Sequence, residues 1–176
     1  MNKTQGKRAG FSLVELVIVI VILGIIAAIA IPRISSGSKN AGESALRANL
    51  ATLRSAVDWY YGEHKNNFPG AKSDGANAAN TEKAFVNQLI LYSDVDGGVS
   101  TAKDAAHPCG PYLRGSFPTL PVGLNASKAT VTVVPDATPL TATPGDGTGW
   151  KYSTGTGQII ANVTETGADN ITYDKY

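Results

Sequence analysis

Apolar residues form one uninterrupted block near the start of the chain. From Leu16 to Ile31 every residue is apolar or glycine, and Leu13-Val14 extend the block toward the N-terminus. As a helix, residues 11–31 would cover roughly 31 Å at about 1.5 Å per residue, which matches the hydrocarbon core of a bilayer. The pattern therefore predicts a membrane-spanning helix. It also places one carboxylate, Glu15, inside that helix, where a charge is costly without a partner.

Beyond the apolar block, the apolar positions become periodic. They recur at spacings of four, three and four residues, at Leu46, Leu50, Leu53 and Val57. This spacing puts them on one face of a helix, with Tyr60 or Tyr61 next in the series. The pattern predicts one helix over about residues 11–64. Its first half, residues 11–33, is apolar all round, and its second half, residues 34–65, is amphipathic.

Two residues weaken the predicted helix. Gly24 lies within the apolar block, and Pro32 ends it. Glycine costs about 1 kcal/mol relative to alanine in a helix interior, and proline removes a backbone donor. The helix is therefore expected to be least stable between these two positions.

From residue 66 onward the chain is rich in Gly, Pro, Thr, Asn and Asp, with short apolar runs between turn residues. Residues 84–92 fit either a short helix or a connecting loop. Runs of β-branched and aromatic residues predict strands at residues 129–134, 150–153, 158–163 and 171–173. The middle two should form a hairpin, because Thr154-Gly155-Thr156-Gly157 supplies glycines for turn positions with positive φ.

These patterns predict an α+β fold with a single head domain over residues 66–176. The long N-terminal helix should pack its amphipathic half against a small antiparallel sheet of three to four strands. A chain of 176 residues has room for one such domain beside the helix, and a second domain is not expected.

Charge sets the expected orientation in a membrane. The cations Lys3, Lys7 and Arg8 precede the apolar block, and the nearest acidic residues after it are Glu43 and Asp58. This asymmetry places the N-terminus in the cytoplasm and residues 34–176 outside. Two other interpretations are a secretory signal cleaved after Ala28-Ile29-Ala30 and a plain uncleaved anchor. Neither of them has a use for Glu15.

Composition excludes some classes of function. The formal net charge is +1, and without the three leading cations 12 basic side chains remain against 14 acidic ones. A nucleic-acid-binding surface is therefore not expected. Cys109 is the single cysteine, so no intramolecular disulfide can form.

The segment Gly10-Phe11-Ser12-Leu13-Val14-Glu15-Leu16, with basic residues before it and Pro32 after it, resembles the prepilin signature of type IV pilins and type II secretion pseudopilins. The resemblance implies that a prepilin peptidase cuts after Gly10, removes residues 1–10 as a leader, and methylates the new amine of Phe11. It further implies that Glu15 neutralises the Phe11 amine of a neighbouring subunit. It also implies that the helix between Gly24 and Pro32 can unwind in assembled filaments.

Two later segments carry weaker resemblances to the same family. Residues 149–162 are similar to the terminal hairpin of pseudopilin-like proteins, and residues 109–113, Cys-Gly-Pro-Tyr-Leu, are similar to the segment that joins helix to sheet in major pseudopilins. Many Gram-negative type IV pilins have a cysteine pair in a carboxy-terminal loop. This chain departs from them, because Cys109 has no second cysteine to pair with.

The resemblance implies a structural function and no enzymatic activity. The expected partners are identical or homologous pilin subunits, the prepilin peptidase and an inner-membrane assembly platform. The expected location is a single pass through the inner membrane, with the head periplasmic, or extracellular once assembled. The alternative, from another class, is a membrane-anchored binding module that acts without polymerising.

No catalytic or metal site is predicted. His107-Pro108-Cys109 offers two possible ligands, but zinc normally needs three or four, and His64 is the only other histidine. The segment 94–98, Asp-Val-Asp-Gly-Gly, resembles part of a calcium loop. Calcium is the one cofactor that the resemblance to pseudopilins implies. The adjacent aromatic residues Trp59, Tyr60 and Tyr61 are expected to contact the core rather than to form an exposed patch.

Overall fold

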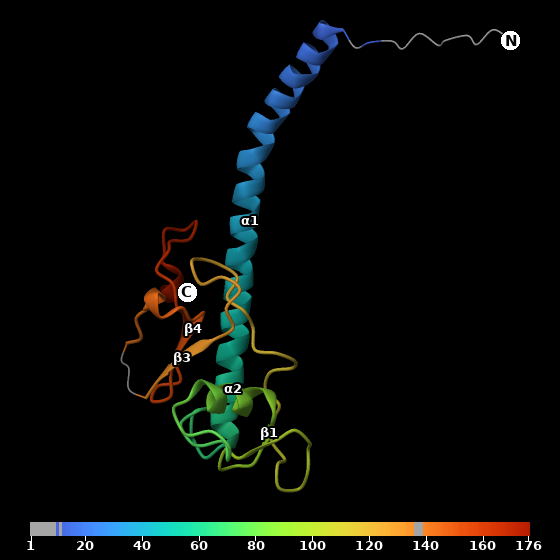
Figure 1. Ribbon diagram of the computed structural model, residues 1–176. Helices are drawn as coiled ribbons and strands as arrows, with labels where there is room; N and C mark the ends of the chain where they lie inside the picture. The colour runs from blue at the N-terminus through green and yellow to red at the C-terminus, as the bar shows by residue number, and fades with distance from the viewer. Residues whose placement is uncertain (1–9, 11, 136–138) are drawn as a thin grey trace, which may run out of the picture. The chain divides into compact units, whose positions relative to one another are not determined.

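The computed structural model describes residues 10, 12–135 and 139–176, and for residues 30–36 and 38 it describes the backbone alone. The chain divides into an N-terminal unit, Met1–Lys39, and a head, Asn40–Tyr176. Helix α1, Leu13–Glu63, contributes residues to both units (Figure 1). The shorter helices and the strands described below all belong to the head.

Helix α1 covers nearly the whole range that the sequence predicts. It contains 51 residues, and the backbone is α-helical at both Gly24 and Pro32. Proline removes a single backbone donor, and the turns on either side keep theirs. The expected loss of helix between Gly24 and Pro32 concerns an assembled filament, so it stays a prediction.

The amphipathic half of α1 forms one wall of the head's core. Leu46, Leu50, Leu53 and Val57 are buried, each at most 1% exposed. They share one apolar cluster with side chains of the sheet and of helix α2, Glu82–Ile90, among them Trp150, Tyr152, Ile159, Ala161, Phe85 and Leu89. Burial of one such side chain stabilises the fold by about 1.5–3 kcal/mol. Packing of this stripe therefore docks the outer half of α1 on the head.

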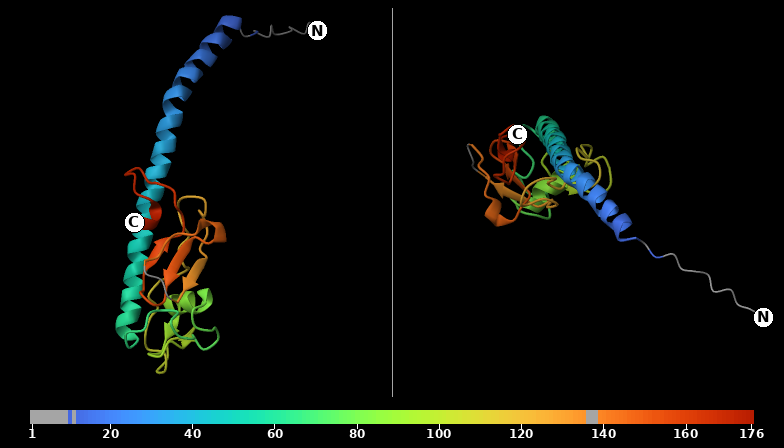
Figure 2. Two further views of the ribbon diagram at one scale, coloured as in Figure 1. Left: turned by 90° about the vertical axis from the view of Figure 1, so that its left-hand side faces the viewer. Right: turned by 90° about the horizontal axis from the view of Figure 1, so that it is seen from above.

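The larger sheet has three short strands in the order β3-β4-β5, and it lies alongside the head portion of α1 (Figures 1 and 2). The strands are β3, Val131–Val134, β4, Trp150–Ser153, and β5, Ile159–Ala161. Strands β4 and β5 form the predicted antiparallel hairpin, with Trp150 opposite Ala161. Strands β3 and β4 are parallel, with Val131 opposite Trp150. The α+β class is thus confirmed, with a mixed rather than purely antiparallel sheet.

The parallel pairing follows from the length of the connection between β3 and β4. Parallel neighbours need a crossover of about a dozen residues or more. Residues 135–149 supply one, and they include the 3-10 turn η1, Pro144–Asp146. The composition of these segments predicted that they form strands. It carries no information on whether β3 pairs parallel or antiparallel to its neighbour.

The turn of the β4–β5 hairpin depends on Gly157. Its φ is 71°, in the left-handed region, and its N–H donates to the Ser153 carbonyl at 2.9 Å. A Cβ at this position would overlap the Phe68 ring. Glycine is therefore required both for the backbone conformation and for the space that Phe68 occupies.

Two segments differ from the predicted elements. Residues 171–173 form no strand, and the prediction of a strand there was wrong. One isolated bridge joins Thr166 to Thr172, and the 3-10 turn η2, Tyr173–Lys175, follows. The turn allows the Tyr173 hydroxyl to reach Glu43 on α1, at 3.2 Å.

Residues 84–92, which fitted either a helix or a loop, lie mostly in α2. Thr81 is its N-cap, and the Thr81 hydroxyl accepts the Ala84 N–H at 3.3 Å. A second, unpredicted hairpin follows α2, formed by β1, Tyr92–Ser93, and β2, Val99–Ser100. Strands of two residues are too short to leave a periodic pattern in the sequence.

Candidate functional site

The first turn of α1 holds Glu15 in a reciprocal capping arrangement with Ser12. The Ser12 N–H donates to Glu15 Oε2 at 2.8 Å, and the Val14 N–H donates to Ser12 Oγ at 3.3 Å. The Leu16 N–H donates to the Ser12 carbonyl at 3.2 Å. This is the capping box that Ser-x-x-Glu sequences form at helix starts. Sequence reasoning treated Glu15 only as a carboxylate in need of an amine and missed this nearer partner.

One oxygen of Glu15 stays available in this arrangement. Among the described residues no donor contacts Glu15 Oε1, and the only hydrogen bond to the carboxylate is the one from Ser12. The helix dipole adds a favourable field for a negative charge in the first turn. The chain therefore fixes the position of the carboxylate while leaving it able to accept a second donor from outside.

Apolar side chains surround the first part of α1 and are open to solvent. From Leu13 to Ile29 the large apolar side chains are between 43% and 78% exposed. A contiguous exposed surface of this kind marks an interface with protein or lipid. Within the described residues, no helix combines the length and the apolar character needed to traverse a membrane.

The predicted processing residues lie at the edge of the described chain. Gly10 is exposed, and a Cβ added there would meet no atom within 4 Å. Phe11 and the leader residues before Gly10 lie outside the described residues. The same holds for the side chain of Pro32, whereas Gly24 is described, with open space around it.

In the head, His64 belongs to a buried aromatic cluster at the end of α1. Its ring stacks on Tyr60 at 3.6 Å and meets Tyr112 edge-on at 5.9 Å. His64 Nδ1 lies 2.8 Å from the Tyr60 carbonyl, and Nε2 lies 3.0 Å from Ser93 Oγ. These partners suit a neutral ring that donates from Nδ1 and accepts at Nε2. Burial is the largest influence on the ring and lowers the pKa of His64.

The other residues considered as metal ligands are not assembled into a site. His107 Nδ1 contacts Asp104 at 2.9 Å, and Cys109 bonds through its backbone to Ser93. Within the described part of the chain, no three His, Cys, Asp or Glu side chains gather closely enough to hold a metal ion.

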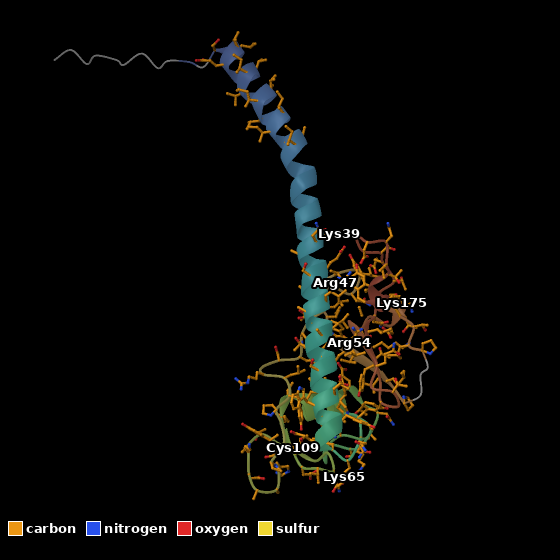
Figure 3. All side chains as sticks on the ribbon, turned by 180° about the vertical axis from the view of Figure 1, so that it is seen from behind. Lys39, Arg47, Arg54, Lys65, Cys109 and Lys175 are labelled. Atoms are coloured by element: carbon orange, nitrogen blue, oxygen red, sulfur yellow. The ribbon has the colours of Figure 1, made fainter. Side chains whose placement is uncertain are left out.

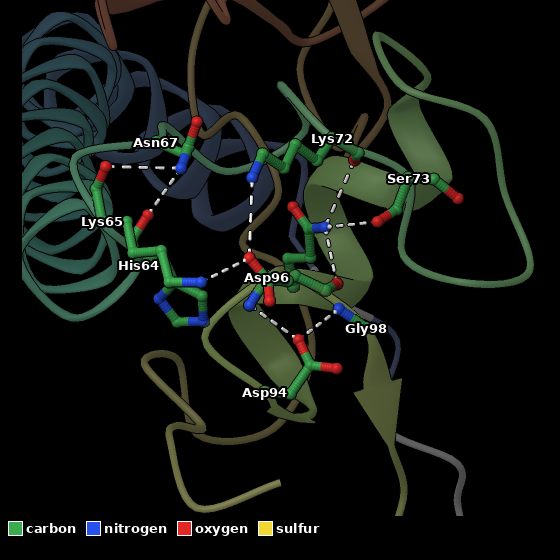
Figure 4. Close-up of polar contacts among 10 residues, drawn as sticks. His64, Lys65, Asn67, Lys72, Ser73, Asp94, Asp96 and Gly98 are labelled. Atoms are coloured by element: carbon green, nitrogen blue, oxygen red, sulfur yellow. Dashed lines mark hydrogen bonds and ion pairs between the residues drawn. The ribbon is translucent and has the colours of Figure 1, made fainter. Parts of the chain in front are cut away.

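The segment 94–98 is a turn held by the Asp94 carboxylate (Figure 4). Asp94 Oδ1 accepts the backbone N–H groups of Asp96 and Gly98, at 2.8 and 3.0 Å. The Asp96 carboxylate pairs with Lys65 at 2.8 Å and with Lys72 at 3.8 Å. These lysines lower the pKa of Asp96, with the Lys65 hydrogen bond as the largest cause. Both carboxylates thus have protein partners.

The C-terminal segment is tied to α1 by charged and aromatic contacts, with Arg47 and Arg54 facing it (Figure 3). Arg47 bonds Asp169 at 2.6 Å and lies over the Tyr176 ring, 3.8 Å from its centroid. Arg54 donates to the Tyr176 carbonyl at 2.9 Å. Buried Glu43 accepts the Ala168 N–H at 2.9 Å. Together these contacts hold the end of the chain without a disulfide.

The three adjacent aromatic residues near the end of α1 separate into different environments. Tyr60 is buried, and Tyr61 stacks on Phe68 at 4.4 Å. Trp59 is 68% exposed, so the expectation that it contacts the core was wrong. Consecutive helix residues point about 100° apart, and Tyr60, not Trp59, continues the buried stripe.

Trp59 stands between two hollows in the head's surface. The larger has a volume of about 600 Å³ and is lined by small residues of α1 together with Glu63, Pro111 and Tyr112. The smaller, about 510 Å³, is lined by Ser55, Asp58, Gly62 and Glu63 beside the same indole. In the lining of the larger hollow, the Tyr112 hydroxyl donates to Glu63 Oε2 at 2.5 Å.

Comparison with known proteins gives a consistent set of relatives. A family profile described as "Prokaryotic N-terminal methylation motif" matches residues 5–31. A "Fimbrial protein" of Neisseria meningitidis is 32% identical over 115 residues, which cover 65% of this chain and 64% of that protein. "Type II secretion system core protein G" of Pseudomonas aeruginosa is 33% identical over 54 residues, 31% of this chain and 38% of that protein.

A third relative, "Type IV narrow pilus major component PilA5" of Thermus thermophilus, is 49% identical over 50 residues, which cover 28% of this chain and 43% of that protein. The chain therefore spans less than two thirds of the length of each of these relatives. No solved structure matches the chain significantly. The family resemblance seen in the sequence is confirmed by the profile and the relatives together.

Proposed function

We propose that the chain, which is similar to type IV pilins and pseudopilins, is a structural subunit, and not an enzyme, of a type IV pilus-like filament or a type II secretion pseudopilus. The observation that carries the proposal is the combination, on one helix, of an exposed apolar surface with a carboxylate positioned at its first turn. Such a surface must be covered, and a membrane and neighbouring helices are its two natural covers.

In the proposed cycle, a prepilin peptidase cleaves after Gly10 and methylates Phe11, and residues 11–33 hold the subunit in the inner membrane. An assembly platform then moves subunits from the membrane into the filament, where their apolar helix halves pack against one another. The head is periplasmic before assembly, or extracellular once a filament extends. The apolar, uncharged composition of residues 16–31 supports storage in a bilayer.

Glu15 would pair with the Phe11 amine of a neighbouring subunit. The capping contact with Ser12 uses Oε2 and leaves Oε1 to accept the amine. In an apolar environment an unpaired carboxylate and an unpaired amine are each costly, so forming the pair favours one register between subunits. The pairing thereby couples insertion of a subunit to its correct alignment.

The test compares three variants in cells that express the chain with its assembly machinery. Glu15→Ala removes both the charge and the cap, whereas Glu15→Gln keeps an acceptor for the Ser12 N–H and removes only the charge. Ser12→Ala removes one hydroxyl of the cap, worth about 1 kcal/mol, and keeps the charge. Sheared filaments, measured against total subunit, should be lost in both Glu15 variants and retained in Ser12→Ala.

The outcomes separate the two roles of Glu15. If Glu15→Gln assembles as well as the parent, Glu15 acts as a helix cap and the charge pairing is wrong. If the parent forms no filaments while it stays folded and anchored in the membrane, the chain is instead a binding module that acts without polymerising.

A further inference from the structure

Four Asn-x-Ser/Thr triplets occur in the chain, and each is a sequence that an N-glycosylating enzyme can recognise. The first, residues 2–4, precedes Gly10 and would be removed with the leader. The other three lie in the head and begin at Asn125, Asn162 and Asn170. Because so short a motif often occurs by chance, the environment of each asparagine in the folded head decides which of them can accept a sugar.

Two of these asparagines belong to the interior of the head. Asn162 is fully buried, and its Nδ2 donates to Asp146 Oδ1 at 2.7 Å and to Thr148 Oγ1 at 2.8 Å. Asn125 is 4% exposed, and its Nδ2 donates to the Asn162 carbonyl at 3.0 Å and to the Pro144 carbonyl at 3.2 Å. An amide nitrogen has two hydrogens to donate. In both residues the atom that would carry the sugar is therefore buried and already bonded.

Asn170 differs, because it is exposed in a tight loop. The Gly167 N–H donates to the Ile171 carbonyl at 2.8 Å, and the Asn170 N–H donates to the Gly167 carbonyl at 3.3 Å. The φ of Asn170 is 61°, a left-handed conformation that asparagine tolerates. Within the described part of the chain, no hydrogen bond uses the Asn170 side-chain amide or the Thr172 hydroxyl. The acceptor nitrogen and the hydroxyl of this triplet are thus both free.

Contacts with α1 hold this loop in a defined position. The Ala168 N–H donates to Glu43 Oε1 at 2.9 Å, and the Asp169 carboxylate pairs with Arg47 at 2.6 Å. The two residues before Asn170 are therefore attached to the helix, whereas the Asn170 side chain remains exposed. An enzyme can accordingly reach this asparagine in the folded head, without local unfolding. Asparagine triplets of this kind are expected in surface loops of exported proteins.

We propose that Asn170 is an N-glycosylation site that receives an oligosaccharide from a lipid-diphosphate-linked donor once the head has left the cytoplasm. A bond forms between Asn170 Nδ2 and the anomeric carbon of the first sugar, and the bond from that carbon to the diphosphate oxygen breaks. The lipid diphosphate leaves with the bonding electron pair, and Nδ2 loses one proton, so nothing is oxidised or reduced. The proposal rests on the extracytoplasmic head of the function proposed above.

Mass spectrometry of the full chain, extracted from the membranes of its source organism, tests the site. The protein should be heavier than its sequence by the mass of an oligosaccharide. Fragmentation of the tryptic peptide 152–175 should place the sugar on Asn170, and fragmentation is needed because the same peptide contains Asn162. Asn170→Asp should abolish the added mass, because it removes the acceptor nitrogen and keeps a residue that tolerates the left-handed conformation.

Matched variants separate recognition of the triplet from the structure of the loop. Thr172→Ala should abolish the added mass, whereas Thr172→Ser should retain it, because serine keeps the hydroxyl. Ser127→Ala and Thr164→Ala remove the triplets of Asn125 and Asn162 at exposed positions. Both of these control variants should leave the added mass unchanged.

An unmodified Asn170 in the parent protein would overturn the proposal. An added mass that persists in Asn170→Asp, or that is lost equally in Thr172→Ser and Thr172→Ala, would overturn it as well. Filaments are scored separately, in the sheared fraction. Filaments built from unmodified subunits would count against the glycosylation site and leave the proposed structural function intact. Glycosylated protein that forms no filaments would support the site and count against that function, so the two failures are distinguishable.

Discussion

At the scale of single residues, the head's polar groups show which side chains satisfy their hydrogen bonds and which do not. Tyr152 is fully buried, and its hydroxyl has no partner among the described residues. Tyr173 is also buried, and its hydroxyl donates to Glu43 at 3.2 Å. A buried polar group without a partner costs about 1–3 kcal/mol, whereas a satisfied one contributes about 1 kcal/mol. The two tyrosines should therefore respond in opposite ways to loss of the hydroxyl.

The first prediction uses this pair. Tyr152→Phe should leave the free energy of unfolding of the head unchanged or raise it by about 1 kcal/mol, because it removes an unpaired hydroxyl and keeps the ring that stacks on Phe85. Tyr173→Phe should lower it by about 1 kcal/mol. Urea unfolding of both variants measures the difference. A clear loss of stability in Tyr152→Phe would show that its hydroxyl has a partner in solution.

His64 gives a prediction for pH. Burial lowers the pKa of His64 in the folded head below the ordinary 6.5, so the unfolded chain takes up this proton first as the pH falls. Stability should accordingly be full above pH 6.5 and decline below it, by at most about 1.4 kcal/mol per pH unit from this group. The decline should appear in urea midpoints as the pH falls below about 6.5. His64→Gln should flatten it, and His107→Gln should not.

Two features of single residues were not predicted from the sequence, the helix cap at Glu15 and the exposure of Trp59. The Ser12-x-x-Glu15 spacing is typical of a capping box. Within an apolar block, the charge of Glu15 was interpreted only as needing an amine, so the cap was not predicted. Trp59 and Tyr60 are adjacent aromatic residues, so composition does not show which of them is buried. Spacing alone decides between them, since Tyr60 lies three residues after Val57, and Trp59 lies only two residues after it.

At the scale of elements, α1 owes its position on the head to packing. Its buried stripe was visible in the sequence because a period of three to four residues is independent of tertiary context. Residues outside this stripe also contact the head. Arg54, which lies off the buried stripe, donates to the Tyr176 carbonyl at 2.9 Å and to the Ile159 carbonyl at 3.4 Å. Its long side chain reaches segments that a helical wheel does not place beside it.

Leu53→Ala should therefore destabilise the head strongly. Leu53 is fully buried in the α1 stripe, and truncation of such a leucine costs about 2–5 kcal/mol. Because Arg54 has partners, the appropriate control on the exposed side is Ser55→Ala, which should change stability by less than about 0.5 kcal/mol. Thermal or urea unfolding of the head, residues 40–176, measures both variants. Equal and small effects would contradict docking of α1 through this stripe.

At the scale of the whole molecule, the sequence specified the class of fold better than its connections. The helix, the three strands and the β4–β5 hairpin follow from local patterns of apolar residues and glycine. The parallel pairing of β3 with β4 and the end of the chain follow from contacts between distant residues, such as Arg47 with Asp169. No period or motif records those contacts. The features of the candidate site divide in the same way. Glu15 follows from a motif, whereas the hollows beside Trp59 exist only in the folded head.

The last prediction concerns the mature start of the chain. If the family's processing applies, membrane-extracted protein should begin at Phe11, with one methyl group on its amine, and intact mass with N-terminal sequencing should show both. Gly10→Val should block the cut. Since a Cβ at Gly10 meets no described atom within 4 Å, this variant should not disturb the fold, and loss of cleavage would then report recognition by the peptidase. A mature chain that starts at Ile31 would establish an ordinary signal peptide, and with Glu15 removed the proposed assembly mechanism would have no basis.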